Sequence, residues 1–417
     1  MSEVLLLAQR ARQASRRLAT TSSRERDGAL HAMADALDSR AAEVLAANAA
    51  DMDAARAKGT AEGLLDRLAL DESRLKSIAD ALRALAALPD PIGEIIGGHT
   101  LPNGLELRQI RVPMGVVGMI YEARPNVTAD AAGLALKTGN AVILRGGSMA
   151  MNSNLTITRV LADAATSAGM PEGAIQSIES PEHSAAEELM GLHDYIDVLI
   201  PRGGAGLIRS VVENAKVPVI ETGIGNCHVY VHEAADLDMA RRIVVNAKTQ
   251  RPSVCNAAES LLVDEAVYRE ALPPIIAALE ERGVLLHGDE KAMALGAASS
   301  MVAAIDEDWG TEYHCLEMSV KVVSGLDEAV EHINTYGTKH SEAIVTGDYE
   351  AARRFLNEVD AAAVYVNAST RFTDGGEFGL GAEIGISTQK LHARGPMGLT
   401  ALTSSKFIAM GDGQIRE

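Results

Sequence analysis

Aromatic residues are scarce in this chain of 417 residues, which has 1 Trp, 8 Tyr and 4 Phe. Its core must therefore rest on Ala, Leu, Ile, Val and Met, as in helix-rich or α/β proteins with small-residue interfaces. The length exceeds that of one ordinary domain and predicts two or three. With 47% hydrophobic and 23% charged residues, the composition excludes a disordered chain.

Cysteine is also rare, and only Cys227, Cys255 and Cys315 are present. An odd number of cysteines without a CxxC pair argues against a disulfide framework. We therefore expect a reducing, cytoplasmic location.

The chain has no excess of positive charge, because 38 Lys and Arg against 57 Asp and Glu give a net charge of −19. A field of that sign repels phosphodiester backbones and anionic headgroups, so we expect no nucleic-acid partner and no membrane partner. No apolar stretch approaches the ~20 residues that span a bilayer. A small anionic ligand in a locally basic pocket is still compatible with this charge.

The basic N-terminus allows two interpretations. Residues 1–24 contain five arginines and a single acid, Glu3, as organellar presequences do. The same pattern continues into further helix without a cleavage-like break, so we favour a first amphipathic helix.

The pattern of apolar and polar residues changes at two points along the chain. The first ~90 residues predict helices throughout. Asn103-Gly104 then marks a β-hairpin, which could form an arm for subunit contact, and residues 399–410 alternate like a strand that could pair with it.

From Val112 onward, short apolar runs alternate with helical stretches. Runs at 116–120, 141–144 and 196–200 predict strands buried on both faces, hence a parallel, doubly wound sheet. After about residue 230 the alternation begins again, with strands expected at 261–263, 320–323, 343–345 and 363–366, which predicts a second α/β domain.

Cys255 lies in a polar loop between a predicted helix and a predicted strand, near Lys248 and Arg251 in sequence. Cations lower the pKa of a thiol and a loop exposes it, so a reactive thiolate is one interpretation. A buried, inert cysteine is the other. Cys227 and Cys315 lie in strand-like apolar context and fit the inert alternative better.

Asn126 and Glu221 each follow a strand-like run. An amide at Asn126 could stabilise an oxyanion at the positive end of a helix, or could merely cap that helix. Glu221 precedes a glycine-rich turn and could act as a base, orient a ribose or simply face solvent.

Two glycine-rich turns follow predicted strands, at Gly146-Gly147-Ser148 and at Gly203-Gly204. Either could receive pyrophosphate at a helix N-terminus, and Arg145 and Arg202 beside them suit phosphate. Neither turn has the full G-x-G-x-x-G fingerprint, so plain helix entry is the alternative.

The histidines give no metal site. His228 and His232 are four residues apart on a strand-like run rather than a helix, with no third ligand spaced nearby, so we expect no metal. His332 and His340 could be structural.

Taken together, these segments resemble the aldehyde dehydrogenase superfamily, and within it the γ-glutamyl phosphate reductases. The likeness runs along the whole chain and is carried by residues 112–118, 121–128, 139–148, 323–344, 371–372 and 379–398. Glu221 and Cys255 have the superfamily's order and spacing for its glutamate and nucleophile. The segment 323–344 is the most discriminating, because it resembles that family's own signature.

The resemblance implies an α/β, aldehyde dehydrogenase-like fold with two doubly wound domains and a small β oligomerisation arm. Residues 1–98 and 114–228 would bind NADP(H), 229–380 would form the catalytic domain, and 99–113 with 381–417 would form the oligomerisation segments.

The implied reaction is NADPH-dependent reduction of γ-glutamyl phosphate to glutamate 5-semialdehyde with release of phosphate, in proline biosynthesis. Cys255 would be the nucleophile, Asn126 with the Cys255 N–H would hold the oxyanion, and Glu221 would belong to the site. The expected cofactor-binding residues are Arg145, Gly146, Gly147, Ser148, Arg202, Gly203 and Gly204. Arg124 and Arg371 would bind the anionic substrate.

Two positions depart from oxidising aldehyde dehydrogenases, which have a lysine where Arg145 falls and usually a carboxylate where Ser148 falls. Loss of that carboxylate removes repulsion toward a 2′-phosphate, and Arg145 can pair with the phosphate, so NADPH is favoured over NADH. Met149 also stands where relatives tend to have an acid.

The same residues are also compatible with two other functions. One is an oxidising aldehyde dehydrogenase that uses water, and the other is a non-catalytic relative that binds nucleotide or scaffolds a partner such as glutamate 5-kinase. We also expect a homo-oligomer and consider association with that kinase.

Overall fold

The computed structural model describes residues 2–122, 124–296 and 301–416. The chain divides into two compact units. Unit 1 comprises residues 1–222, 379–385 and 397–417, and unit 2 comprises residues 223–378 and 386–396.

Unit 1 begins with helices, as the sequence predicts: α1 (Glu3–Leu18), α2 (Ser23–Ser39), α3 (Ala41–Ala57), α4 (Glu62–Leu68) and α5 (Glu72–Ala86). Ser22 caps α2 and forms a capping box with Glu25. The favoured interpretation of the basic N-terminus is confirmed, since α1 buries one apolar face that includes Leu18.

A four-stranded parallel sheet of order β5-β4-β3-β6 forms the centre of unit 1. Its strands are β3 (Val116–Tyr121), β4 (Ala141–Gly146), β5 (Ile175–Ser177) and β6 (Val198–Arg202). The helices between them are α6 (Pro125–Lys137), α7 (Met151–Ser167) and α8 (His183–Gly191), and α9 (Ala205–Asn214) follows β6. The strands β3 and β4 are buried along their whole length, which confirms the predicted sheet with both faces covered.

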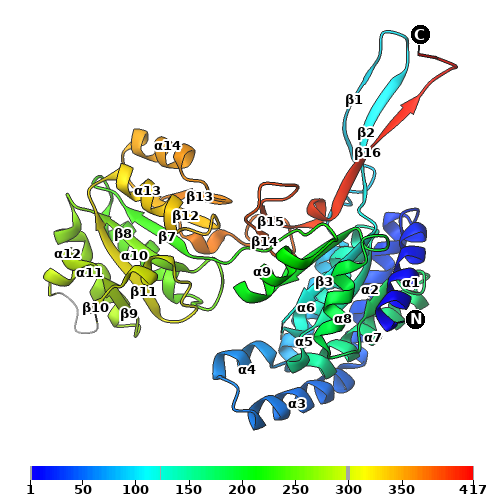
Figure 1. Cartoon of the computed structure of the whole chain (residues 1–417), viewed down its shortest axis with the longest axis horizontal. Coiled ribbons are helices and arrows are strands. Elements are labelled where there is room, and N and C mark those ends of the chain that lie inside the picture. The colour runs from blue at the N-terminus through cyan, green and yellow to red at the C-terminus, as the bar shows by residue number, and fades with distance from the viewer. Residues whose placement is uncertain (1, 123, 297–300, 417) are drawn as a thin grey trace. The chain divides into compact units, whose positions relative to one another are not determined.

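The predicted hairpin is also present. Strands β1 (Ile95–Thr100) and β2 (Glu106–Pro113) pair antiparallel, and β16 (Thr403–Met410) adds to β2 from the far end of the chain. The three strands project from the rest of unit 1 as an arm (Figure 1).

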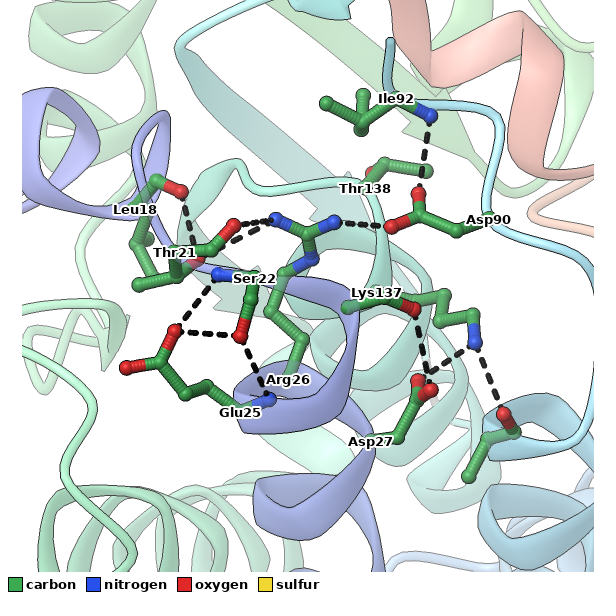
Figure 2. A network of polar contacts seen from close by, with 12 residues as sticks. Leu18, Thr21, Ser22, Glu25, Arg26, Asp27, Asp90, Ile92, Lys137 and Thr138 are labelled. Atoms are coloured by element: carbon green, nitrogen blue, oxygen red, sulfur yellow. Dashed lines mark hydrogen bonds and ion pairs between the residues drawn. The ribbon is translucent and has the colours of Figure 1, made fainter. Parts of the chain in front are cut away.

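A buried polar network anchors the segment that leads into the arm (Figure 2). The Arg26 guanidinium, 1% exposed, pairs with Asp90 and also donates to the Thr21 carbonyl at 2.5 Å. Asp90 in turn accepts from the Ile92 N–H at 2.9 Å. Lys137, equally buried at the end of α6, donates to Asp27 at 2.6 Å and to the Ala86 carbonyl at 2.8 Å.

Unit 2 contains a seven-stranded sheet of order β10-β9-β11-β8-β7-β12-β13, parallel throughout. Its strands are β7 (Cys227–Val231), β8 (Ala258–Asp264), β9 (Leu285–Gly288), β10 (Met301–Ala303), β11 (Glu317–Val323), β12 (Ser341–Val345) and β13 (Ala363–Val366). The helices are α10 (Leu237–Thr249), α11 (Tyr268–Glu280), α12 (Glu290–Ala294), α13 (Leu326–Tyr336) and α14 (Tyr349–Glu358). A short antiparallel pair, β14 (Ile386–Ser387) and β15 (Gly395–Pro396), completes the unit.

Strand alternation separates two hydrophobic clusters on the faces of this sheet. Val229 and Val231 face one cluster with α10 and α11, whereas Tyr230 between them faces the other with α13 and α14. Short 3₁₀ segments at Ser148–Ala150, Asp306–Gly310, Thr370–Phe372 and Leu399–Leu402 complete the two units.

Two expectations about single residues are resolved by the fold. Cys227 is buried in β7 as predicted, but the prediction for Cys315 is wrong, because it is exposed in a bend before β11 begins. Met149, which had no explanation in the sequence, packs partly buried against the cluster of α3 and α4 that includes Met52 and Leu65.

We expect Asp90→Ala to destabilise the protein by about 3 kcal/mol, because it leaves the buried Arg26 charge without its carboxylate. Urea unfolding would measure this change. Asp163→Ala, at the exposed pair with Arg40, is the matched control and should cost less than about 1 kcal/mol. Equal losses in both variants would contradict an anchoring role for the buried network.

Candidate active site

Cys255 lies in the loop between α10 and β8, and its side chain is partly exposed, as a reactive thiol requires. The loop is held by its neighbour Asn256, whose amide donates to the Thr373 carbonyl at 2.9 Å. The Asn256 carbonyl accepts from the Thr370 hydroxyl at 2.7 Å. Asn256 was not predicted, although its position next to Cys255 was a signal for it.

Arg371 is a cation that interacts electrostatically with Cys255. Burial lowers the pKa of the Arg371 guanidinium, and the negative charge of Cys255 opposes that shift. Its Nε donates to Gln250 at 2.7 Å, and its Nη1 pairs with the Asn256 amide oxygen. Arg371 therefore supplies positive charge beside the thiol while the same side chain braces the loop.

Lys248, one of the two cations that lie near Cys255 in sequence, forms a buried ion pair with another residue. Lys248 is fully buried and pairs with Glu259, which is fully buried as well. Burial raises the pKa of Glu259 to about 7, and the Lys248 charge partly offsets that rise. The lysine lies on α10, which packs against β8, the strand that carries Glu259.

The glycine-rich turn before β7 passes directly behind Cys255. A Cβ built on Gly225 would lie 1.5 Å from the Cys255 carbonyl oxygen, so only glycine permits this approach. The Gly225 N–H donates to Glu312 at 2.7 Å, which fixes the turn. Two residues after Gly225, the Cys227 thiol donates to the same Cys255 carbonyl at 3.2 Å.

In unit 1, the predicted cofactor residues meet at one edge of the sheet. Tyr121 aligns with Gly146 on one side and with Arg202 on the other, so the three strand ends lie side by side. This is the carboxyl edge, where open parallel sheets bind ligands. The turn Gly147-Ser148 follows β4 there, and Gly203-Gly204 follows β6.

The two helix N-termini at this edge differ in what they offer an anion. The first amides of α7 are already taken by Asp51 from α3, which accepts from the Ser153 N–H at 2.8 Å and the Asn152 N–H at 3.2 Å. At α9, the Gly204 N–H donates to Glu122 at 3.1 Å. Because Glu122 is exposed, a phosphate can displace its carboxylate, so α9 suits pyrophosphate better than α7.

Arg145 is buried at the end of β4. Its guanidinium donates to the carbonyls of Pro181 and Glu182 at 3.1 and 3.3 Å, and its Nε is buried without a partner. Burial lowers its pKa. An unsatisfied buried donor beside an exposed Ser148 fits a site for a phosphorylated ribose.

Asn126 occupies the second position of α6, after Arg124 at the N-cap and Pro125. The capping interpretation of Asn126 is therefore wrong. Its exposed amide donates to Asp130 at 3.3 Å, and burial raises the pKa of Asp130 to about 6. Asp130, one helical turn away, was not predicted.

Glu221 is partly exposed in an irregular segment, and the segment is fixed by the neighbouring Thr222 hydroxyl, which donates to the Pro201 carbonyl at 2.8 Å. Arg124 is partly buried where α6 begins. Ala123, inside the segment that resembles the reductases, lies outside the described residues.

The carboxyl edge of the unit 2 sheet has a different character. A cavity of about 650 Å³ there is lined by seven carboxylates and one arginine, with His232 at its wall. Such a lining repels an anionic substrate. Cys255 instead lies at the amino edge of this sheet, in the loop that precedes β8.

The part of the chain that the structure describes contains no group of three or more His, Cys, Asp or Glu residues suited to a metal. His228 instead pairs with the buried Glu342 at 3.0 Å. Within those same residues, no helix is long and apolar enough to cross a membrane.

Comparison with known proteins places the chain in a family. Residues 2–304 match the aldehyde dehydrogenase family. The γ-glutamyl phosphate reductase of Moorella thermoacetica is 61% identical over 415 residues, covering 100% of this chain and 99% of that protein. The crystal structure of the Thermotoga maritima γ-glutamyl phosphate reductase superposes with a TM-score of 0.96 at 48% identity, covering 100% of both chains.

A more distant solved structure, the γ-glutamyl phosphate reductase of Saccharomyces cerevisiae, is 31% identical with a TM-score of 0.55, covering 100% of this chain and 99% of that one. The expected aldehyde dehydrogenase-like fold is thus confirmed. The chain belongs to the γ-glutamyl phosphate reductase family of the aldehyde dehydrogenases.

Proposed function

We propose that the protein reduces γ-glutamyl phosphate to glutamate 5-semialdehyde with NADPH and releases phosphate, as a step of L-proline biosynthesis. The observation that carries this proposal is the 61% identity to a γ-glutamyl phosphate reductase over the full length. The partly exposed Cys255 beside the Arg371 cation supports it.

Cys255 acts as the nucleophile. Its thiolate attacks the acyl carbon, the bond from that carbon to the phosphate oxygen breaks, and phosphate leaves with the bonding electrons. The product is a thioester on Cys255, which accepts hydride more readily than an ester or amide does. NADPH, when bound, supplies that hydride.

The resulting thiohemiacetal collapses as its C–S bond breaks, which returns the Cys255 thiolate and releases the aldehyde. The Asn126 amide and the Cys255 N–H stabilise the oxyanions formed at both stages. Glu221 belongs to the site as a positioning group or proton shuttle. Arg124 and Arg371 bind the anionic substrate.

Residues 1–98 and 114–228 serve cofactor binding, 229–380 catalysis, and 99–113 with 381–417 oligomerisation. Arg202 and the turn at Gly203-Gly204 take the pyrophosphate, and Arg145 with Gly146, Gly147 and Ser148 takes the adenosine side. A cytoplasmic location belongs to the proposal, because a free thiol nucleophile needs a reducing compartment.

Cys255→Ala should lower semialdehyde-dependent NADP⁺ reduction by at least about 10³-fold, since no other group can form the thioester. The assay runs in reverse, with and without phosphate, and circular dichroism verifies the fold. Cys315→Ala, at the exposed cysteine, is the control and should retain activity.

The same assay separates the alternatives. Wild-type activity that does not need phosphate indicates an oxidising aldehyde dehydrogenase. A wild-type protein without activity, whose Cys255 is not protected from alkylation by substrate, indicates a scaffold.

Ser148→Asp should lower kcat/KM for NADPH about 10-fold and leave NADH nearly unaffected, because the new carboxylate repels the 2′-phosphate. Ser148 is exposed, so the change does not disturb the core. Ser148→Asn has the same shape without the charge and should behave like wild type. Wild-type preference for NADH would remove the basis for this assignment.

The arm supports a homo-oligomer, since it exposes large apolar side chains such as Phe407 (70%), Ile95 (58%) and Ile96 (45%). In sedimentation velocity we expect an oligomer that Phe407→Asp dissociates, whereas Lys406→Asp, on the other face of β16, leaves it intact. A monomeric wild type contradicts this proposal. Adding glutamate 5-kinase to the same experiment tests whether that kinase associates.

A further inference from the structure

We propose that Cys227 is a positioning residue for Cys255, holding the Cys255 carbonyl from the buried side of the loop through its thiol. The inference rests on the proposed nucleophilic role of Cys255 and goes beyond it, because Cys227 itself contacts no substrate. It assigns a task to a second cysteine that the reaction does not use.

The backbone around Cys255 has little regular structure to hold it. The ladder between β7 and β8 pairs Cys227 with Ala258, and its register then shifts, so that His228 lies opposite Ser260. The Cys255 carbonyl lies before the point where this ladder begins. The Cys227 thiol, 0% exposed, donates to that carbonyl at 3.2 Å.

The thiol is held in its donating form. Burial raises the pKa of Cys227, and the negative charges of Glu342, Cys255, Glu259 and Glu312 raise it further. A neutral thiol has a single proton to donate. In this environment Cys227 keeps that proton.

The neighbouring groups direct the proton toward Cys255. The Ser341 hydroxyl donates to Thr373 at 2.6 Å, so its oxygen accepts from Nδ1 of His340 at 2.8 Å. That nitrogen lies 3.8 Å from the Cys227 sulfur, whereas the Cys255 carbonyl oxygen lies 3.2 Å from it. The carbonyl is therefore the nearer acceptor for the thiol proton.

The same network also contacts the Cys255 loop through Thr373, whose carbonyl accepts a hydrogen bond from the Asn256 amide at 2.9 Å. Lys339, just before His340, has a φ of 62°, a left-handed conformation that costs free energy in a lysine. The strained backbone of Lys339 thus directly precedes His340.

The test uses a Cys315→Ala background, in which the partly exposed Cys255 and the buried Cys227 are the cysteines that remain. Cys227→Val keeps the apolar volume but removes the donor, so kcat should fall about 10-fold with KM for the semialdehyde changed less than about 2-fold. Cys227→Ser restores a donor and should stay within about 3-fold of the background.

Alkylation by iodoacetamide, located by peptide mass spectrometry, should show a changed rate at Cys255 in the Val variant and a near-background rate in the Ser variant. If the Val variant does not fold, kcat is measured instead in Cys227→Ala, which removes the donor and cannot clash with its surroundings. Background values of kcat in Val and Ala, or equal losses in Val and Ser, would overturn the positioning role.

Cys255→Ala in the same background keeps the two proposals apart. If it is inactive while Cys227→Val is normal, only the positioning role fails. If it is active, the nucleophile assignment fails first.

Discussion

Unit 2 depends on the close approach between the Gly225 backbone and the Cys255 carbonyl. No side chain fits there, so the chain has to place a glycine at that point and to pin it with Glu312. The approach brings the turn before β7 against the loop before β8. At the same loop, the Cys255 carbonyl accepts from Cys227, and the side chain of Asn256 contacts Arg371 and Thr373.

The residues proposed for cofactor binding and for catalysis lie at different kinds of sheet edge in the two units. In unit 1 the residues proposed to bind the cofactor follow the strands, at the carboxyl edge, where helix N-termini face an anion. In unit 2 Cys255 precedes its strand, at the amino edge, while the carboxyl edge carries a cavity lined mostly by carboxylates. The acids that line this cavity thus lie at the opposite edge of the sheet from Cys255, the proposed nucleophile.

The sequence predicted those structural features that depend on residues close together in the chain. The Asn103-Gly104 turn, the buried strands β3 and β4, and the helix α6 follow from turn preferences and apolar runs. The prediction for Cys315 failed because an apolar run does not show where a strand begins, and β11 begins at Glu317, after it.

Partners far apart in sequence were beyond such reasoning. That Lys248 faces Glu259, and that Arg371 provides the charge at Cys255, depends on which helix face covers which strand. The contact of Cys227 with Cys255 requires two parallel strands in a particular register. The roles assigned to Asn126, Glu221 and Arg124 remain predictions that rest on family resemblance.

The arm has a consequence for how the protein is made. Its third strand, β16, follows the whole of unit 2 in the sequence. During synthesis, the edge of β2 that pairs with β16 must therefore stay open until unit 2 has been translated, and an open strand edge is where chains aggregate. A truncation anywhere in unit 2 would leave that edge uncovered for good, so misassembly of unfinished chains is the specific hazard of this architecture.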